Sequence, residues 1–222
     1  MASRHSYGDD PSQFGELSGA GPVAVLIHGG FWRDRYDLTL MAPLADDLVA
    51  RGWAAWNVEY RRLGSGGGVP ETLDDVSAAI DLLAELDVDR SRVVAIGHSA
   101  GGHLAAWAAT REDPRVAVTA VVSQAGVLDV RRAWELGLSN DVAREFLRGD
   151  IENARVASPI ERLPLGVPAL LVHGAQDDTV PLEISQRFAR ESGATLVVEP
   201  QEGHFGHLDP SNPMWQAVIK WL

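Results

Sequence analysis

The sequence predicts an α/β fold in which a mostly parallel sheet is covered on both faces by helices. Two observations carry this prediction. Short runs rich in Val, Ile and Leu are typical of strands buried on both faces, and longer segments with helical periodicity separate them. Because strands that alternate with helices form parallel sheets, we expect one sheet of about six to eight strands.

The individual elements can be placed along the chain from these two periodicities. The expected strands cover residues 23–27, 54–58, 92–96, 118–123, 169–172 and 195–198. The expected helices cover residues 38–51, 73–86, 100–110, 182–192 and 213–222.

The segment from 127 to 168 breaks this rhythm because it contains no strand pattern. Residues 131–148 within it are typical of one or two helices. An excursion between two strands at the edge of a sheet often forms a lid or a pocket wall, and a plain surface helix is the alternative. A length of 222 residues fits one domain. We therefore expect a single domain over 1–222 with a lid-like insertion at about 127–167.

The composition narrows the function classes. The formal net charge of -12 repels phosphate backbones, so nucleic acid is not an expected partner. The chain has no cysteine, which excludes disulfides, thiolate metal sites and a cysteine nucleophile. The polar amino-terminal stretch lacks the apolar core of a signal peptide, and no apolar run is long enough to cross a membrane. We expect a cytoplasmic protein without a membrane partner.

The strongest motif is Gly97-His98-Ser99-Ala100-Gly101, which follows an expected strand and opens an expected helix. This is the setting of a nucleophile elbow, in which a tight turn exposes the serine hydroxyl and requires small residues on either side. The alternative is a glycine-rich turn with an incidental serine. We predict that Ser99 is a nucleophile.

A second motif, His28-Gly29-Gly30-Phe31-Trp32, ends the first expected strand. Acyl transfer needs N–H donors for the developing oxyanion, and glycines let the backbone approach closely. The predicted donors are the N–H groups of Gly30, Phe31 and Ala100, and Gly29 remains an alternative. His28 is expected to brace this loop.

Two later segments supply an acid and a base in the order Ser, Asp, His, which this type of site uses. Within Gly174-Ala175-Gln176-Asp177-Asp178-Thr179-Val180-Pro181 the spacing selects Asp177, and Asp178 is expected to cap the next helix. After the last strand, His204 is the predicted base and His207 the alternative. Asp177 would then orient His204 beside Ser99.

These motifs together resemble the arylformamidase (kynurenine formamidase) branch of the α/β-hydrolases, close to the hormone-sensitive-lipase-like esterases. The resemblance runs from about residue 7 to the end and includes the segment around Tyr60-Arg61. It implies an α/β-hydrolase fold, a triad of Ser99, Asp177 and His204, and hydrolysis of N-formylkynurenine without a metal or cofactor. The chain between Ser12 and Val23 is brief, so the first two strands usual in the family are expected to be shortened or missing.

The substrate is predicted to be a small molecule. Trp32, Phe31, Trp134 and Phe205 are candidates for an aromatic wall, and core packing is their alternative role. A short-chain carboxylesterase is the competing activity, and a non-catalytic binding module on the same fold is a more remote one. A peptidase of this type usually carries an extra domain, for which the chain has no room. In the last helix, Trp215 and Trp221 would suit a contact in a homodimer.

Overall fold

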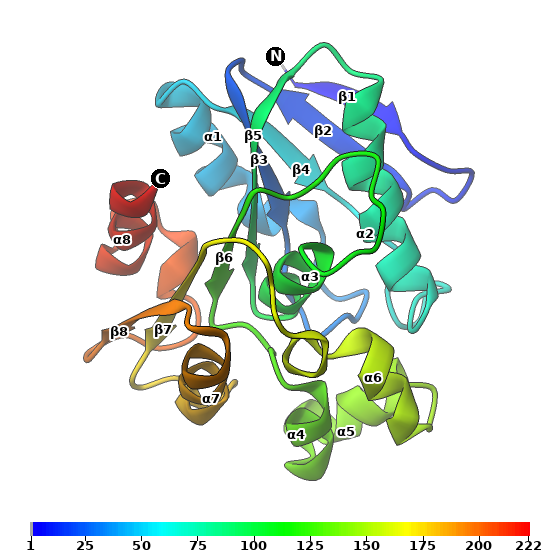
Figure 1. The fold of residues 1–222 in the computed structure, drawn as a ribbon, viewed down its shortest axis with the longest axis vertical. Coiled ribbons are helices and arrows are strands. Elements are labelled where there is room, and N and C mark those ends of the chain that lie inside the picture. The colour runs from blue at the N-terminus through cyan, green and yellow to red at the C-terminus, as the bar shows by residue number, and fades with distance from the viewer. Residues whose placement is uncertain (1) are drawn as a thin grey trace.

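Residues 2–222 of the computed structural model form an eight-stranded sheet in the order β1-β2-β4-β3-β5-β6-β7-β8 (Figure 1). The strands β3 to β8 run parallel, whereas β1 and β2 are antiparallel to their neighbours. This arrangement confirms the predicted fold class. The strand bounds are β1 Ser3–Ser6, β2 Phe14–Ser18, β3 Pro22–Ile27, β4 Ala54–Val58, β5 Asp89–His98, β6 Ala120–Gln124, β7 Ala169–Gly174 and β8 Thr195–Glu199.

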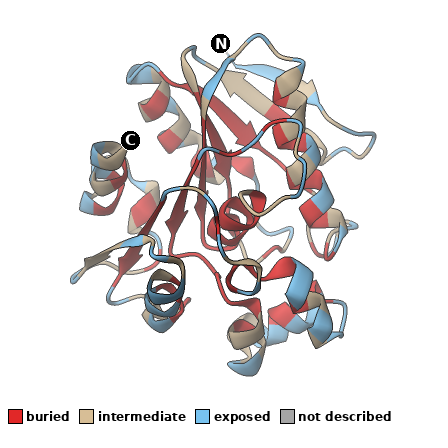
Figure 2. Cartoon of the chain, viewed as in Figure 1, coloured by how far each residue is buried: buried red, intermediate tan, exposed pale blue. Residues whose placement is uncertain are grey.

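Helices cover both faces of the sheet. Alternate residues of β3 show why: Val23, Val25 and Ile27 face one core, and Ala24 and Leu26 face the other. The first core is closed by α2, α3 and α7, and the second by α1 and α8. The central strands are therefore buried on both sides (Figure 2). The helix bounds are α1 Ala42–Ala50, α2 Glu71–Asp81, α3 Ala100–Ala108, α4 Val130–Glu135, α5 Leu138–Phe146, α6 Ala154–Ala157, α7 Leu182–Ser192 and α8 Pro213–Trp221.

Of the two alternatives expected for the first two strands, shortened or missing, the structure shows short ones, of four and five residues. In β1 and β2 only Gly15 is buried, so neither strand has the apolar run that marks a central strand. Register pairs Gly15 with Val58 and Leu17 with Trp56, which attaches this hairpin to β4. A Cβ on Gly15 would lie 2.4 Å from the Trp56 ring, so the glycine lets the hairpin pack directly on that indole.

The segment between β6 and β7 forms the small helices α4, α5 and α6, which lie together at one end of the sheet (Figure 1). Two buried donors on α3 hold it in place. The His103 Nε2 donates to the Ala157 carbonyl at 2.7 Å, and the Trp107 Nε1 donates to the Val156 carbonyl at 2.8 Å. The segment is thus fastened to the helix that follows the elbow.

The carboxyl-terminal helix differs from expectation at one of its tryptophans. Trp215 is buried in the second core, and its Nε1 donates to Asp47 Oδ2 at 2.7 Å. This residue is therefore not available for a contact between copies, and the homodimer stays a prediction that depends on the half-buried Trp221. None of the helices within residues 2–222 is long and apolar enough to span a membrane.

Candidate active site

The turn between β5 and α3 places Ser99 at the carboxyl edge of the sheet. Its backbone has φ 56° and ψ -118°, a conformation that L residues rarely adopt. A hydrogen bond from the Ser99 amide to the Gln124 carbonyl, at 2.8 Å, holds the turn against the next strand.

Two glycines make this sharp turn possible. A Cβ on Gly97 would lie 2.0 Å from the Gly101 carbonyl oxygen, and a Cβ on Gly101 would lie 1.9 Å from the Ile27 carbonyl oxygen. Neither position has room for any side chain, because both contacts are to backbone. The motif requires small residues at these positions because three segments of backbone approach one another closely there.

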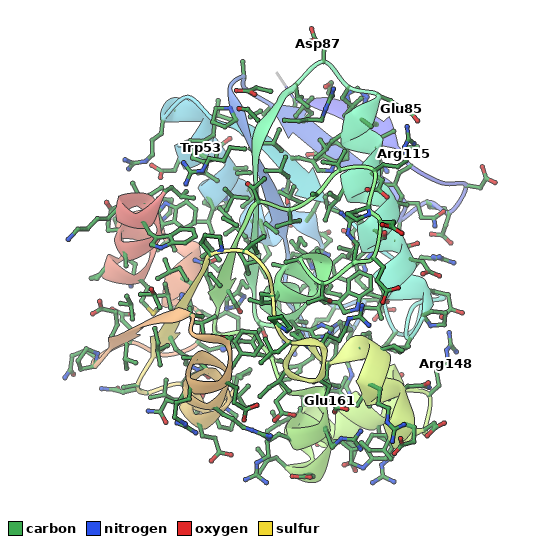
Figure 3. All side chains as sticks on the ribbon, viewed as in Figure 1. Trp53, Glu85, Asp87, Arg115, Arg148 and Glu161 are labelled. Atoms are coloured by element: carbon green, nitrogen blue, oxygen red, sulfur yellow. The ribbon has the colours of Figure 1, made fainter. Side chains whose placement is uncertain are left out.

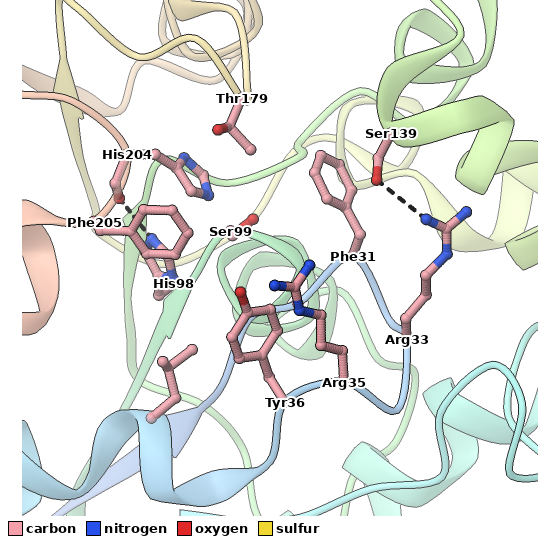
Figure 4. A pocket seen from close by; sticks show the side chains of 12 residues that line it. Phe31, Arg33, Arg35, Tyr36, His98, Ser99, Ser139, Thr179, His204 and Phe205 are labelled. Atoms are coloured by element: carbon pink, nitrogen blue, oxygen red, sulfur yellow. Dashed lines mark hydrogen bonds between the residues drawn. The ribbon is translucent and has the colours of Figure 1, made fainter.

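An acid and a base meet beside this turn. The His204 Nδ1 donates to Asp177 Oδ2 at 2.7 Å. The other carboxylate oxygen of Asp177 accepts the amides of Thr179 and Val180, each at 2.8 Å. Because Nδ1 is hydrogen-bonded to the carboxylate, the Nε2 of His204 is the ring nitrogen left to accept a proton. Ser99 and His204 line the same cavity (Figure 4).

The Asp177 carboxylate is held ionised. Burial alone would raise its pKa, but hydrogen bonds from His173 and His204 outweigh burial, and the pKa lies well below its usual range. The His173 Nε2 lies 3.2 Å from Asp177 Oδ2 and donates to the Val180 carbonyl at 3.0 Å. An anion at this point stabilises a protonated imidazole on His204.

His207 and Asp178, the alternatives to His204 and Asp177 in the sequence, do not take part in this pair. His207 is fully buried beside His98, and no hydrogen bond joins its ring to another described residue. Asp178 does not cap α7, which corrects the sequence prediction: the residue at the cap is Pro181, without a side-chain hydrogen bond. Instead, Asp178 Oδ1 accepts the Thr179 hydroxyl at 3.1 Å.

His98 supports the loop that carries the base. Its Nε2 donates to the His204 carbonyl at 2.8 Å, and the ring centroids of the two histidines lie 4.7 Å apart (Figure 4). Burial lowers the His98 pKa to about 3, so the ring is neutral at physiological pH. The sequence motif treats this position as variable, and nothing in the motif signals this contact.

The loop after β3 carries the predicted oxyanion donors. Gly30 has φ 117° and Phe31 has φ 51°, and both residues line the cavity. Within residues 2–222, the amides of Gly30, Phe31 and Ala100 have no hydrogen-bond acceptor. A Cβ on Gly29 would lie 2.8 Å from the His98 carbonyl oxygen and 3.0 Å from Ser99 Cβ, so this glycine also lies close to the elbow, and the choice among the loop donors stays a prediction.

His28 lies beneath this loop, as a bracing residue would. Its ring stacks on Tyr60 with centroids 4.4 Å apart, and its Nε2 lies 3.1 Å from Glu59 Oε1. The buried Glu59 also accepts the Leu38 amide at 3.0 Å, and its own carbonyl accepts the Tyr7 hydroxyl at 2.6 Å. Burial would raise the Glu59 pKa, but the contacts with His28, the Tyr60 amide and the Arg62 guanidinium together outweigh burial, so the pKa is lowered.

The cavity has a volume of about 240 Å³, which suits a small substrate. Its aromatic lining consists of Phe31, Tyr36 and Phe205, and the Phe205 side chain is 55% exposed. Among the described residues that line it there is no Asp or Glu.

Two predicted wall residues lie outside this cavity, which corrects the sequence analysis. Trp32 is fully buried: it stacks on Phe146 with centroids 4.2 Å apart, and its Nε1 donates to His103 Nδ1 at 3.2 Å. Trp134, on α4, packs under the Arg144 guanidinium, 4.6 Å from the ring centroid. Both aromatic rings stabilise the segment between β6 and β7 and do not line the cavity.

Several lining residues were missed because they have no catalytic motif. Arg35 and Tyr36 follow the glycine motif in the same loop, and Thr179 follows the acid. Their position between the end of a strand and the next helix could have identified them as lining residues, because such loops form the pockets of open α/β sheets. Among residues 2–222 no group of three or more His, Asp or Glu side chains is arranged to hold a metal ion.

Comparison with known proteins assigns the family. The model of the BD-FAE family matches residues 15–191. The chain belongs to the BD-FAE family of α/β-hydrolases. The matched segment contains Ser99 and Asp177 but ends before His204, which the remaining part of the chain contributes.

Individual relatives of this BD-FAE chain are esterases and a formamidase. It is 31% identical to esterase LipC of Mycobacterium tuberculosis over 82% of this chain and 52% of LipC. It is 28% identical to kynurenine formamidase avaC of Aspergillus versicolor over 86% of this chain and 83% of that protein. The chain thus spans about half the length of LipC and most of avaC.

A solved structure supports the fold. Thermogutta terrifontis esterase 2, phosphonylated by sarin, superposes with a TM-score of 0.81 at 24% identity, over 99% of this chain and 92% of that one. This agreement covers nearly the whole of both chains, so the α/β-hydrolase fold extends over the full sheet described above.

Proposed function

We propose that this chain is a serine hydrolase that removes a small acyl or formyl group from an ester or an aryl amide. The observation that carries the proposal is the strained Ser99 turn in one cavity with His204, whose other nitrogen is hydrogen-bonded to Asp177. Three groups in these roles are what nucleophilic acyl transfer requires.

The proposed reaction begins when His204 accepts the Ser99 hydroxyl proton as the oxygen attacks the carbonyl carbon. Asp177 stabilises the imidazolium that results. The amides of Gly30, Phe31 and Ala100 donate to the oxyanion. His204 then returns the proton to the leaving group, and an acyl-enzyme remains that water, activated by His204, hydrolyses.

Within this class we favour arylformamidase, with N-formylkynurenine as the test substrate. The support is the match to a kynurenine formamidase over 83% of that protein and the aromatic lining by Phe31, Tyr36 and Phe205. A short-chain carboxylesterase is the second candidate, supported by the match to LipC.

The deciding experiment compares kcat/KM for N-formylkynurenine and 4-nitrophenyl acetate, with Ser99→Ala as the control. Loss of the nucleophile should lower both activities by about 10⁴-fold or more. Turnover of the formamide supports arylformamidase, and turnover of the ester alone supports the carboxylesterase. An active Ser99→Ala protein would contradict the serine mechanism itself.

A further inference from the structure

Arg35 places a free positive charge at the cavity that contains Ser99. Its guanidinium lies beside the Tyr36 ring, with its central carbon 5.4 Å from the ring centroid (Figure 4). The side chain is exposed and lines the cavity. No carboxylate or carbonyl of residues 2–222 accepts a hydrogen bond from it.

Acidic residues outnumber basic ones by 31 to 19 in this chain, so carboxylates are plentiful. Many arginines elsewhere have a carboxylate partner: Arg61 lies 2.7 Å from Asp75, and Arg115 lies 3.1 Å from Glu85. Arg115 and Glu85 lie on the outer surface in Figure 3, where both charges are exposed. Among the described arginines without a carboxylate partner, Arg35 is the one that lines the cavity with Ser99.

The backbone that carries Arg35 is fixed on both sides. The Arg33 amide donates to the Gly30 carbonyl at 3.0 Å. After it, the Tyr36 carbonyl accepts the Arg62 guanidinium, and the Leu38 amide donates to Glu59. Only the side chain of Arg35 is therefore free to adjust to a ligand.

The second arginine of this loop is less available. The Arg33 guanidinium donates to Ser139 Oγ at 3.3 Å and lies 3.8 Å from Glu145 Oε2 (Figure 4). Its charge still adds to that of Arg35 at a cavity whose described lining contains no carboxylate. The described lining thus contains two guanidinium groups and no carboxylate, within a protein of net charge -12.

We propose that Arg35 binds a carboxylate of the substrate, so that the preferred substrates are small acyl compounds that carry a negative charge near the scissile bond. The inference rests on the hydrolase activity proposed above. A guanidinium matches a carboxylate through two parallel N–H donors, which fixes the orientation of the substrate as well as its charge.

The test uses two pairs of esters that differ in charge. One pair, 4-nitrophenyl hemisuccinate and 4-nitrophenyl butyrate, varies the acyl side. The other, 4-acetoxybenzoate and its methyl ester, varies the leaving group. Arg35→Gln should lower the anionic-to-neutral ratio of kcat/KM by about 10-fold in at least one pair, because a hydrogen-bonded charge contributes that much. Arg115→Gln, a matched arginine on the outer surface, should leave both ratios unchanged.

A binding measurement reads the same site without turnover. Benzoate binding to Ser99→Ala protein, followed by NMR, should weaken about 10-fold when Arg35→Gln is added. Equal benzoate affinity, or unchanged ratios in both ester pairs, would overturn the carboxylate site and leave the hydrolase standing. If wild type hydrolyses neither pair and a fluorophosphonate does not label Ser99, the hydrolase fails instead, and benzoate binding alone decides the anion site.

Discussion

Two loops reach the same cavity and differ in what holds them. At the elbow, Ser99 is 1% exposed and the flanking glycines leave no room for a methyl group. In the loop after β3, Arg35 is exposed and has no described hydrogen-bond partner. The buried loop fixes the geometry of the proposed chemistry, whereas the exposed loop leaves side chains free to select a substrate.

This contrast separates two kinds of sequence change. A substitution at the elbow acts through backbone contacts and threatens both fold and activity. A substitution in the exposed loop acts through charge and should alter the choice of substrate. Three predictions test the buried residues of and around the proposed site, and they are ordered from the largest expected effect to the smallest.

Asp177→Asn should lower kcat/KM by about 10⁴-fold, because an amide no longer holds the His204 tautomer or stabilises its protonated form. The neighbouring Asp178→Asn is the matched control, since within residues 2–222 its carboxylate accepts a hydrogen bond from the Thr179 hydroxyl and from no histidine. Steady-state kinetics on any ester that the wild type hydrolyses will measure both variants. Similar losses in the two variants would refute the distinction between the adjacent acids.

Gly101→Ala should destabilise the fold by about 3 kcal/mol, because its Cβ would lie 1.9 Å from the Ile27 carbonyl oxygen and force backbone apart. Gly166→Ala is the control: φ there is 72° and nothing lies within 4 Å of a Cβ, so only the left-handed conformation is penalised, by about 1 kcal/mol. Urea denaturation gives both values. Equal losses would show that the close approach at the elbow is not rigid.

Acidification from pH 7 to pH 5 should lower the free energy of unfolding. Burial lowers the pKa of His98 to about 3 and that of His103 to about 4. Because unfolded histidines titrate near ~6.5, the unfolded state binds more protons below that pH. This stability is present above pH ~6.5 and is lost as the pH falls towards the folded values, by about 1.4 kcal/mol per pH unit for each such histidine.

Urea denaturation at pH 7, 6 and 5 measures this slope. His103→Asn should reduce the slope of unfolding free energy against pH by the contribution of one histidine, even if the variant also changes the stability at pH 7. A free energy of unfolding that does not change over this range would show that the buried histidines become protonated without unfolding.

Sequence periodicity located the interior of the fold well and its edges poorly. Strand 54–58 and helix 182–192 have the bounds that were predicted, because their apolar residues follow one period from end to end. β1, at the edge of the sheet, and β2 beside it are four and five residues long and contain one buried residue between them, so they carry no such signal. Their positions were not predicted for that reason.

The site shows the same division. The residues of the proposed triad stand in motifs, because a tight turn and a strand end constrain the residues around them. Aromatic residues carry no such constraint. Trp32 and Phe31 are adjacent, yet one stacks in the core on Phe146 and the other lines the cavity. Whether an aromatic ring packs in the core or lines the cavity depends on backbone angles, which residue type does not reveal.

The carboxylate of Glu59 has a consequence for how this molecule opens. This carboxylate is hydrogen-bonded to His28, under the loop after β3, and to the Leu38 amide at the start of the next helical turn. The backbone carbonyl of Glu59 accepts the Tyr7 hydroxyl from the amino-terminal edge of the sheet. Because three segments distant in the chain share one buried anchor, we expect them to open as one cooperative unit whose amides exchange with solvent together. Tyr7 precedes the segment that the family model matches, so an excised 15–191 fragment would lack part of this unit.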